Sequence, residues 1–112
     1  MTLMDDLRRK TEDGLKTLKE TAEGIAFNVE KQARIAGKKM DILRIERKVR
    51  RLYTEVGEYV YGEFALERPI AMETPFLKES MTAISEMKAE IREIEKEIEE
   101  VRSTQPPGHE DR

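Results

Sequence analysis

Few residues in this chain of 112 could do chemistry on a substrate or hold a metal ion. The sequence has no Cys, and its only His, His109, lies in the C-terminal segment Gln-Pro-Pro-Gly-His-Glu-Asp-Arg. A tight zinc site needs Cys or His ligands, and a Ser-His-Asp triad needs a His that the fold holds in place. The sequence therefore predicts a non-enzymatic protein with no catalytic residue, no metal site and no cofactor.

Carboxylates are the remaining candidate ligands, and they are concentrated between Glu90 and Glu100. Carboxylate oxygens suit hard cations such as calcium, magnesium and iron. The sequence contains neither an EF-hand loop nor a Glu-x-x-His pair, so no defined site can be built from these residues. Weak, diffuse binding of cations or of a mineral surface stays open as one alternative function.

The composition favours long helices over a compact enzyme. Charged residues make up 40% of the chain and aromatic residues only 5%, which is typical of coiled coils rather than of average globular domains. No apolar run reaches the length of a membrane span, and the N-terminus lacks the basic start and apolar run of a secretory signal. We therefore expect a cytoplasmic, all-α protein.

Proline and glycine divide the chain into two expected helices, 2–66 and 75–103, joined by a loop at 67–74. The tail 104–112 contains two Pro and a Gly and is expected to be disordered. By domain, we expect a helix at 1–40, a helical hairpin at 41–103 and this tail.

Both expected helices begin with capping signals. Thr2 followed by Asp5 indicates a variant of the capping box. Thr74 and Pro75 indicate the N-cap and the first residue of the second helix, where the missing N–H of proline costs nothing.

Residues 42–101 carry apolar side chains at alternating steps of three and four, the period of a coiled coil. The positions expected to form the seam are Ile42, Ile45, Val49, Leu52, Val56, Tyr59, Leu66, Leu77, Ile84, Met87, Ile91, Ile94, Ile98 and Val101. Pairing residues whose numbers add to 143 gives every seam position a seam partner and sets Glu63 opposite Ser80. The sequence thus predicts an antiparallel two-helix coiled-coil hairpin in that register.

The two arms of this hairpin carry opposite charge. Residues 31–51 contain nine basic and two acidic residues (+7), and residues 52–112 contain seven basic and fifteen acidic residues (−8). The residues expected to pair along the flanks are Arg44, Arg47, Lys48, Arg50 and Arg51 with Glu93, Glu95, Glu97, Glu99 and Glu100. Such pairs would specify orientation more than stability, because each exposed pair contributes only ~0.3–0.5 kcal/mol.

Residues 1–40 extend beyond this hairpin and follow an 11-residue period. Met4, Leu15 and Ala26 recur at that spacing, and so do Leu7, Leu18 and Val29. This period gives a nearly straight apolar stripe along a helix. Such a helix needs a surface to lie against, and we expect a second copy of the chain there, which makes the protein a self-assembling scaffold. The outside of its own hairpin and a lipid surface are the alternatives.

A basic cluster beside this stripe favours the lipid alternative. Lys31, Arg34, Lys38 and Lys39 have no acidic neighbour among them, and we expect the hairpin to leave all four unpaired. Such a cluster suits anionic headgroups, which would make the protein peripheral at a membrane or organelle surface. Phe27 is the only aromatic residue of 1–40, so anchors for insertion are few. Binding to nucleic acid is disfavoured by the net charge of −3 and by the lack of aromatics among the basic residues.

A second apolar face is expected beside the seam. It consists of Tyr53, Gly57, Val60, Tyr61 and Phe64. Tyrosine suits an interface because its hydroxyl needs a polar partner. We expect this face to pack on another copy of the chain, with a foreign protein partner as the alternative.

The stretch 41–61 reads Asp-Ile-Leu-Arg-Ile-Glu-Arg-Lys-Val-Arg-Arg-Leu-Tyr-Thr-Glu-Val-Gly-Glu-Tyr-Val-Tyr. It resembles the coiled-coil module of small bacterial proteins in which, in some members, this module follows a zinc ribbon. The resemblance covers residues 3–103 and implies a helical hairpin of poorly defined role, with no catalytic residues to carry over. Since the chain has no Cys, the zinc ribbon is absent here.

Overall fold

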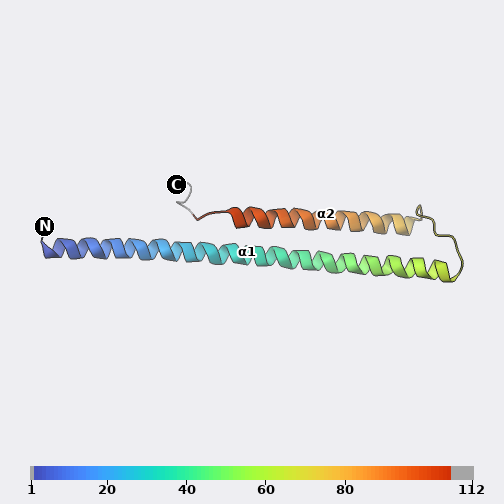
Figure 1. Cartoon of the computed structure of the whole chain (residues 1–112), viewed down its shortest axis with the longest axis horizontal. Helices are drawn as coiled ribbons and strands as arrows, with labels where there is room; N and C mark the ends of the chain where they lie inside the picture. Colours follow the sequence, from blue (N-terminus) through green and yellow to red (C-terminus); the bar gives the residue numbers. More distant parts are fainter. Residues whose placement is uncertain (1, 107–112) are drawn as a thin grey trace.

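The computed structural model describes residues 2–106, which form two α-helices and no strand. Helix α1 is Leu3–Ala65 and helix α2 is Pro75–Ser103. Helix α2 returns antiparallel along the C-terminal part of α1, and the molecule is a rod 97 Å long (Figure 1). The predicted all-α fold, a long N-terminal helix continuing into a two-helix hairpin, is confirmed. His109 and most of the predicted tail lie outside the described residues.

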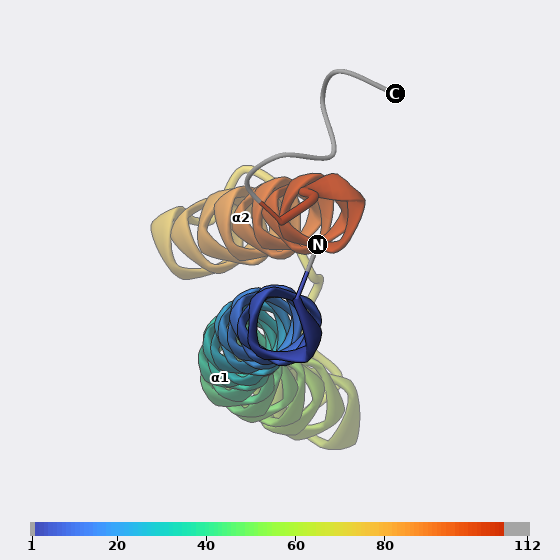
Figure 2. The same ribbon diagram turned by 90° about the vertical axis from the view of Figure 1, so that its left-hand side faces the viewer.

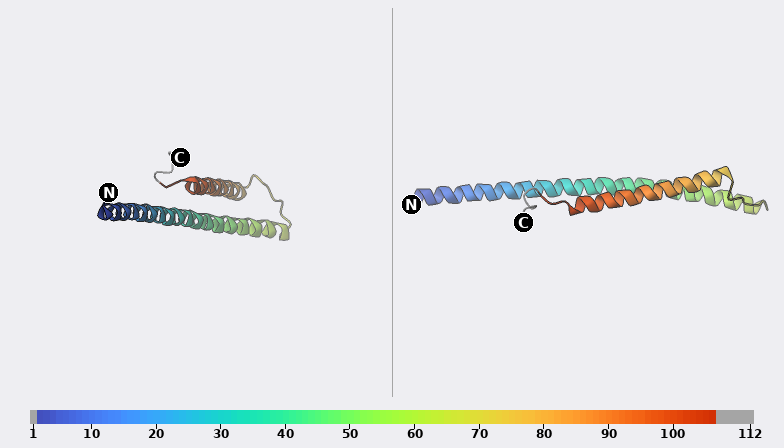
Figure 3. Two further views of the ribbon diagram at one scale, coloured as in Figure 1. Left: turned by 60° about the vertical axis from the view of Figure 1, so that its left-hand side comes forward. Right: turned by 90° about the horizontal axis from the view of Figure 1, so that it is seen from above.

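The hairpin is a single layer of two helices. Viewed from its N-terminal end, α2 lies on one side of α1, and no element of the described chain covers the other sides of either helix (Figure 2). Seen from above, α2 crosses α1 at a shallow angle (Figure 3). Each helix therefore buries one face and leaves the rest of its surface open.

A capping box begins α1, whereas α2 begins with a proline and without a side-chain cap. Thr2 and Asp5 form a capping box: the Asp5 N–H donates to Thr2 Oγ1, and the Thr2 N–H donates to Asp5 Oδ2, both at 3.4 Å. Pro75 is the first residue of α2, as predicted. Thr74 occupies the N-cap position, but its hydroxyl donates to the carbonyl oxygen of Ala71 at 2.6 Å instead of capping the helix.

Helix α1 ends in a Schellman motif. The Arg68 N–H donates to the Glu63 carbonyl oxygen at 2.9 Å, and the Glu67 N–H donates to the Phe64 carbonyl oxygen at 3.1 Å. Glu67 has a φ of 55°, the left-handed conformation in which glycine is usual because it has no Cβ. Any residue other than glycine is therefore strained at this position.

We expect Glu67→Gly to stabilise the hairpin by about 1 kcal/mol. The left-handed conformation costs an L-residue roughly 1–2 kcal/mol, and glycine removes that strain. Part of the gain is lost because glycine raises the conformational entropy of the unfolded chain. Urea unfolding followed by circular dichroism measures the change. Glu67→Ala is the matched control, because it removes the same carboxylate and keeps the strain. Equal stabilisation by both variants would show that the carboxylate of Glu67, and not its backbone conformation, reduces the stability of the hairpin.

The core is one narrow seam between the helices. Six apolar side chains are 2–8% exposed: Ile35, Ile45, Val49, Leu77, Ile84 and Ile98. Leu52, Met87, Ile91 and Ile94 pack against the cluster that Ile45, Val49 and Ile84 form. The other predicted seam residues are partly buried, except Leu66, which is 61% exposed.

The register of the hairpin differs from the predicted one. The rings of Tyr59 and Phe76 pack with centroids 5.1 Å apart, and Lys38 Nζ lies 2.8 Å from Glu97 Oε2. Both pairs of residue numbers add to 135, not 143, so the predicted register is wrong by about one heptad. Glu63 does not pair with Ser80: its carboxylate lies 3.8 Å from the guanidinium of Arg68 in the loop.

The ends of the seam explain this shift. A heptad pattern keeps its seam positions matched after a slip of seven residues, so the pattern alone cannot choose between registers. The observed register leaves Leu66 exposed but buries Ile35, which is 5% exposed, and brings Phe76 against Tyr59. One buried isoleucine and one aromatic contact replace the predicted contact of Leu66 with Leu77.

The shift also moves the start of the paired region. Lys31 Nζ donates to the carbonyl oxygens of Arg102 and Thr104, at 2.5 and 3.1 Å. Helix α2 therefore covers α1 from Lys31 onward, and α1 continues unbroken through the expected domain boundary at residue 40. Residues 2–30 of α1 have no part of α2 beside them (Figure 1).

Candidate interaction surface

The hairpin leaves a long run of large apolar side chains exposed on α1. Between residues 4 and 43, those that are 41–79% exposed are Met4, Leu7, Leu15, Leu18, Ile25, Val29, Met40 and Leu43. We call this set the apolar stripe. It follows the 11-residue period seen in the sequence and extends beyond residue 30, so that part of it lies alongside the paired region.

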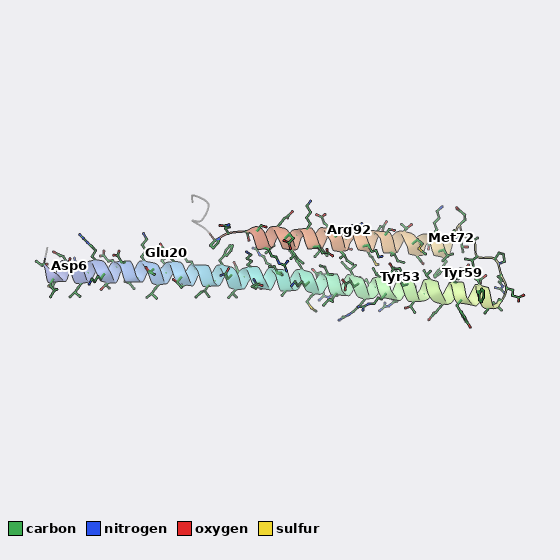
Figure 4. All side chains as sticks on the ribbon, in the orientation of Figure 1. Asp6, Glu20, Tyr53, Tyr59, Met72 and Arg92 are labelled. Atoms are coloured by element: carbon green, nitrogen blue, oxygen red, sulfur yellow. The ribbon has the colours of Figure 1, made fainter. Side chains whose placement is uncertain are left out.

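The apolar stripe lies on the side of α1 that faces away from α2. An α-helix turns by about 100° per residue, so side chains two residues apart point in nearly opposite directions. Val29 is exposed while Lys31 reaches α2, and Leu43 is exposed while Ile45 is buried in the seam. The stripe and the seam therefore occupy opposite faces of one helix. The part of α1 that carries Asp6 and Glu20 has solvent on all sides (Figure 4).

Beyond Leu43 the same side of α1 becomes basic. Arg44, Arg47, Lys48, Arg50 and Arg51 are all exposed. The prediction that they pair with the glutamates of α2 is wrong: within residues 2–106, the ion pair that joins the two helices is Lys38 with Glu97. Arg47 lies two residues before the buried Val49 and so projects away from α2, and Arg44 is 3.5 Å from Asp41 on its own helix.

The basic cluster proposed for anionic surfaces is divided by the hairpin. Lys31 and Lys38 are partly buried, one bonded to backbone carbonyls of the C-terminal end of the hairpin and the other paired with Glu97. The expectation that the hairpin leaves all four residues unpaired is wrong for these two. Arg34 and Lys39 remain exposed.

The second apolar face lies open near the closed end of the hairpin. Tyr61 and Phe64 are 71% and 73% exposed, and Val60 is 36% exposed. Tyr53 is nearer to α2, since Lys88 Nζ lies 5.2 Å from its ring centroid, a cation–π distance. Gly57, between these residues, is exposed.

The loop adds apolar surface that the sequence reasoning missed. Met72 is 68% exposed and Ile70 39%, next to Leu66. Neither residue belongs to a heptad or to the 11-residue repeat, so no periodic signal could have identified it. Met72 and Leu66 are the more exposed of these side chains, and Ile70 is the least exposed.

The described residues offer little for metal chemistry or for crossing a membrane. Residues 2–106 contain no group of three or more His, Cys, Asp or Glu side chains that could hold a metal ion. Two glutamates of the acidic segment are engaged in ion pairs, Glu97 with Lys38 and Glu99 with Arg102. No helix of this part of the chain is both long enough and apolar enough to cross a bilayer.

Comparisons with protein-family models, with curated proteins and with solved structures give no match. What the protein does must therefore be inferred from its own surfaces. Of these, the apolar stripe is the most extended, because it follows α1 from Met4 to Leu43.

Proposed function

We propose that the protein is a non-enzymatic interaction protein that assembles with a second copy of itself through the apolar stripe of α1. The observation that carries this proposal is the exposure of the stripe. At 1.5 Å per residue it runs about 58 Å along the helix, whereas monomeric soluble proteins rarely expose apolar patches larger than a few hundred Å². A partner helix along the stripe would remove this surface from water.

The weakness of the unpaired end supports the same proposal. Residues 2–30 of α1 lie beyond the end of α2, yet they contain Gly14 and Gly24, each of which lowers helix stability by about 1 kcal/mol. Helical stability in proteins comes mainly from packing of an apolar face. An extended helix of this composition is expected to gain that packing from association.

Leu18→Glu tests the proposal at the middle of the stripe. Burial of one leucine contributes about 1.5–3 kcal/mol, and a symmetric pair loses two such contributions, so the dissociation constant should rise about 100-fold or more. Sedimentation velocity over a concentration series measures the change. Thr17→Glu is the matched control: it adds the same charge one residue away, about 100° around the helix and off the stripe, and should dissociate like the parent chain.

A fully helical parent protein that stays monomeric at micromolar concentration would contradict the proposal. So would equal effects of Leu18→Glu and Thr17→Glu, because the stripe would then be no more sensitive than its neighbouring surface.

One observation favours an anionic membrane as a second candidate partner. The stripe leads directly into exposed arginines at positions 44, 47, 50 and 51, and an apolar stripe with adjoining basic residues suits anionic headgroups. Flotation with vesicles that contain phosphatidylserine distinguishes the two candidates. The membrane candidate requires binding that salt weakens and that Arg47→Glu with Arg50→Glu abolishes, whereas self-association requires neither vesicles nor these arginines.

A further inference from the structure

We infer that the hairpin has a second interface for copies of itself, in which a basic and aromatic face of one chain lies on an acidic face of another. The members of the basic–aromatic face are Arg50, Tyr53 and Phe64 of α1 with Met81, Lys88 and Arg92 of α2. The members of the acidic face are Glu79, Glu86, Glu90 and Glu93 of α2. Neither face includes the apolar stripe, so the inference goes beyond the proposed function and does not depend on it.

Tyr53 and Lys88 identify the side of the hairpin on which the basic–aromatic face lies. The two helices form one layer, whose two broad sides are left open by the described residues (Figures 2 and 3). A residue that follows a seam position is turned about 100° to one side of the seam, and a residue that precedes it is turned to the other side. Tyr53 follows Leu52 and Lys88 follows Met87. The 5.2 Å between Lys88 Nζ and the Tyr53 ring centroid shows that these two flanks meet on the same side.

On α1, Arg50 and Phe64 lie on the same side as Tyr53. Arg50 is three residues before Tyr53, and Phe64 is eleven residues, or three turns, after it. Residues at these spacings share one side of a helix. Phe64 is 73% exposed and Tyr53 is 46% exposed, so two aromatic rings are open to a partner here.

On α2, Met81 and Arg92 lie on the same side as Lys88. Met81 is seven residues before Lys88 and 40% exposed, and Arg92 is four residues after it. The three basic side chains of the face, which include Arg50, are exposed, and none of them takes part in an ion pair of residues 2–106. The face therefore combines three positive charges with three exposed apolar side chains.

Glutamates occupy the opposite side of the hairpin. Glu90 precedes the seam residue Ile91, so it lies on the flank of α2 opposite to that of Lys88. Glu97, seven residues further along the same flank, reaches Lys38 of α1 at 2.8 Å and so marks this side. The other members lie three, four or seven residues from Glu90 or from one another: Glu79, Glu86 and Glu93. All four members are exposed, and none takes part in an ion pair of residues 2–106.

The two faces are complementary, but they cannot meet within one chain because they lie on opposite sides of the same layer. The basic–aromatic face carries three positive charges and the acidic face four negative charges. A second copy that lies with its acidic face on the basic–aromatic face brings these charges together. It also offers an apolar contact to Tyr53 and Phe64, because Phe76, which is 38% exposed, precedes Leu77 and so adjoins the acidic face. Burial of the apolar side chains contributes affinity, and the opposite charges select the face.

A second copy accounts for both faces, whereas other occupants account for one. An anionic bilayer or a nucleic acid would fit the basic–aromatic face but would be repelled by the acidic face. The two surfaces that meet are different, so a chain that binds through one face still presents the other to a further copy. Association through these faces can therefore continue beyond two chains.

Sedimentation velocity at low salt concentration tests this interface in the Leu18→Glu background, where association through the apolar stripe is weakened. Leu18→Glu alone should form assemblies that dissociate as salt rises, since the Debye length shortens to about 10 Å at 0.1 M. Adding Lys88→Glu and Arg92→Glu should raise the dissociation constant at least about tenfold, because attractive contacts become repulsive. Adding Lys16→Glu and Lys19→Glu instead is the matched control. It changes the net charge equally at exposed positions outside both faces and should leave the constant within a few-fold.

Complementary variants test whether the two faces meet each other. Glu86→Lys with Glu93→Lys should also raise the dissociation constant at least about tenfold, because it reverses half of the charges of the acidic face. An equimolar mixture of this variant with the Lys88→Glu/Arg92→Glu variant should recover association as pairs, since one chain retains its acidic face and the other its basic–aromatic face. All four positions are exposed, and circular dichroism of each variant checks that its helices are retained.

The outcomes separate the inference from the proposed function. No recovery in the mixture, or a Leu18→Glu chain that stays monomeric at low salt, would overturn the second interface and leave the proposed function intact. Vesicles with phosphatidylserine that bind this monomeric chain, and no longer bind it after Lys88→Glu with Arg92→Glu, would also overturn the interface and assign the face to anionic lipid. Equal assembly of the natural chain and Leu18→Glu would contradict the role of the apolar stripe and leave the second interface intact.

Discussion

Ile45→Asp is expected to release α2 from α1. Ile45 is 8% exposed and belongs to the buried cluster with Val49 and Ile84. Loss of a core isoleucine costs about 2–5 kcal/mol, and burial of an unpaired carboxylate adds to that cost. A small domain with one narrow core has roughly 3–5 kcal/mol of total stability, so the substitution removes most or all of it.

Circular dichroism during thermal unfolding measures this effect, with limited proteolysis to show whether α2 has become accessible. Thr54→Asp is the control, because Thr54 is exposed on α1 and the substitution adds the same charge with a similar helix propensity. A melting temperature for Ile45→Asp within a few degrees of the control would mean that the seam between α1 and α2 is not what holds the hairpin.

Chemical cross-linking is expected to distinguish the observed register of the hairpin from the one predicted from the sequence. A short bifunctional thiol reagent should join the arms of the hairpin in Lys38→Cys/Glu97→Cys, because these side chains meet at 2.8 Å. It should fail in Glu46→Cys/Glu97→Cys, since Glu46 lies eight residues, or about 12 Å, further along α1. Residues 46 and 97 add to 143, so this second pair represents the register that was predicted from the sequence.

Protease cleavage in the loop followed by electrophoresis distinguishes arms that are joined from arms that separate. Dilute protein limits linkage between different chains, and mixing chains of different mass reveals any that occurs. Cross-linking of the 46/97 pair in preference to the 38/97 pair would refute the observed register.

The helices could be predicted almost to the residue from local signals. The expected ranges 2–66 and 75–103 correspond to Leu3–Ala65 and Pro75–Ser103. Capping residues, prolines and the charged composition act within one or two turns of helix, so their effects can be deduced from short stretches of sequence. The antiparallel pairing then follows from two apolar seams joined by a short loop.

The register could not be predicted in the same way. A heptad repeat is unchanged by a slip of seven residues, and the choice depends on contacts at the ends of the seam. Ile35 was not assigned to the seam. Whether the hairpin gains more free energy by burying Ile35 or by burying Leu66 could not be judged from the sequence, and the structure buries Ile35. The errors at Lys31 and Lys38 follow from this one slip, because the shifted α2 reaches them.

The candidate surface was foreseen in part. The 11-residue period predicted an apolar stripe on residues 1–40, and the exposed side chains from Met4 to Val29 follow it. The 11-residue period did not indicate that the stripe continues to Leu43 on the face opposite the seam. Only the observed position of α2 shows that two apolar faces overlap along one stretch of α1.

That overlap makes the two faces of residues 31–43 thermodynamically dependent on each other. Docking of α2 orders this stretch as helix, and in the proposed dimer the partner helix requires the same stretch to be ordered. Whichever contact forms first pays the conformational entropy, so the second binds more tightly, and this coupling is reciprocal. Closure of the hairpin and assembly of two chains would then be cooperative, although the two contacts share no side chain.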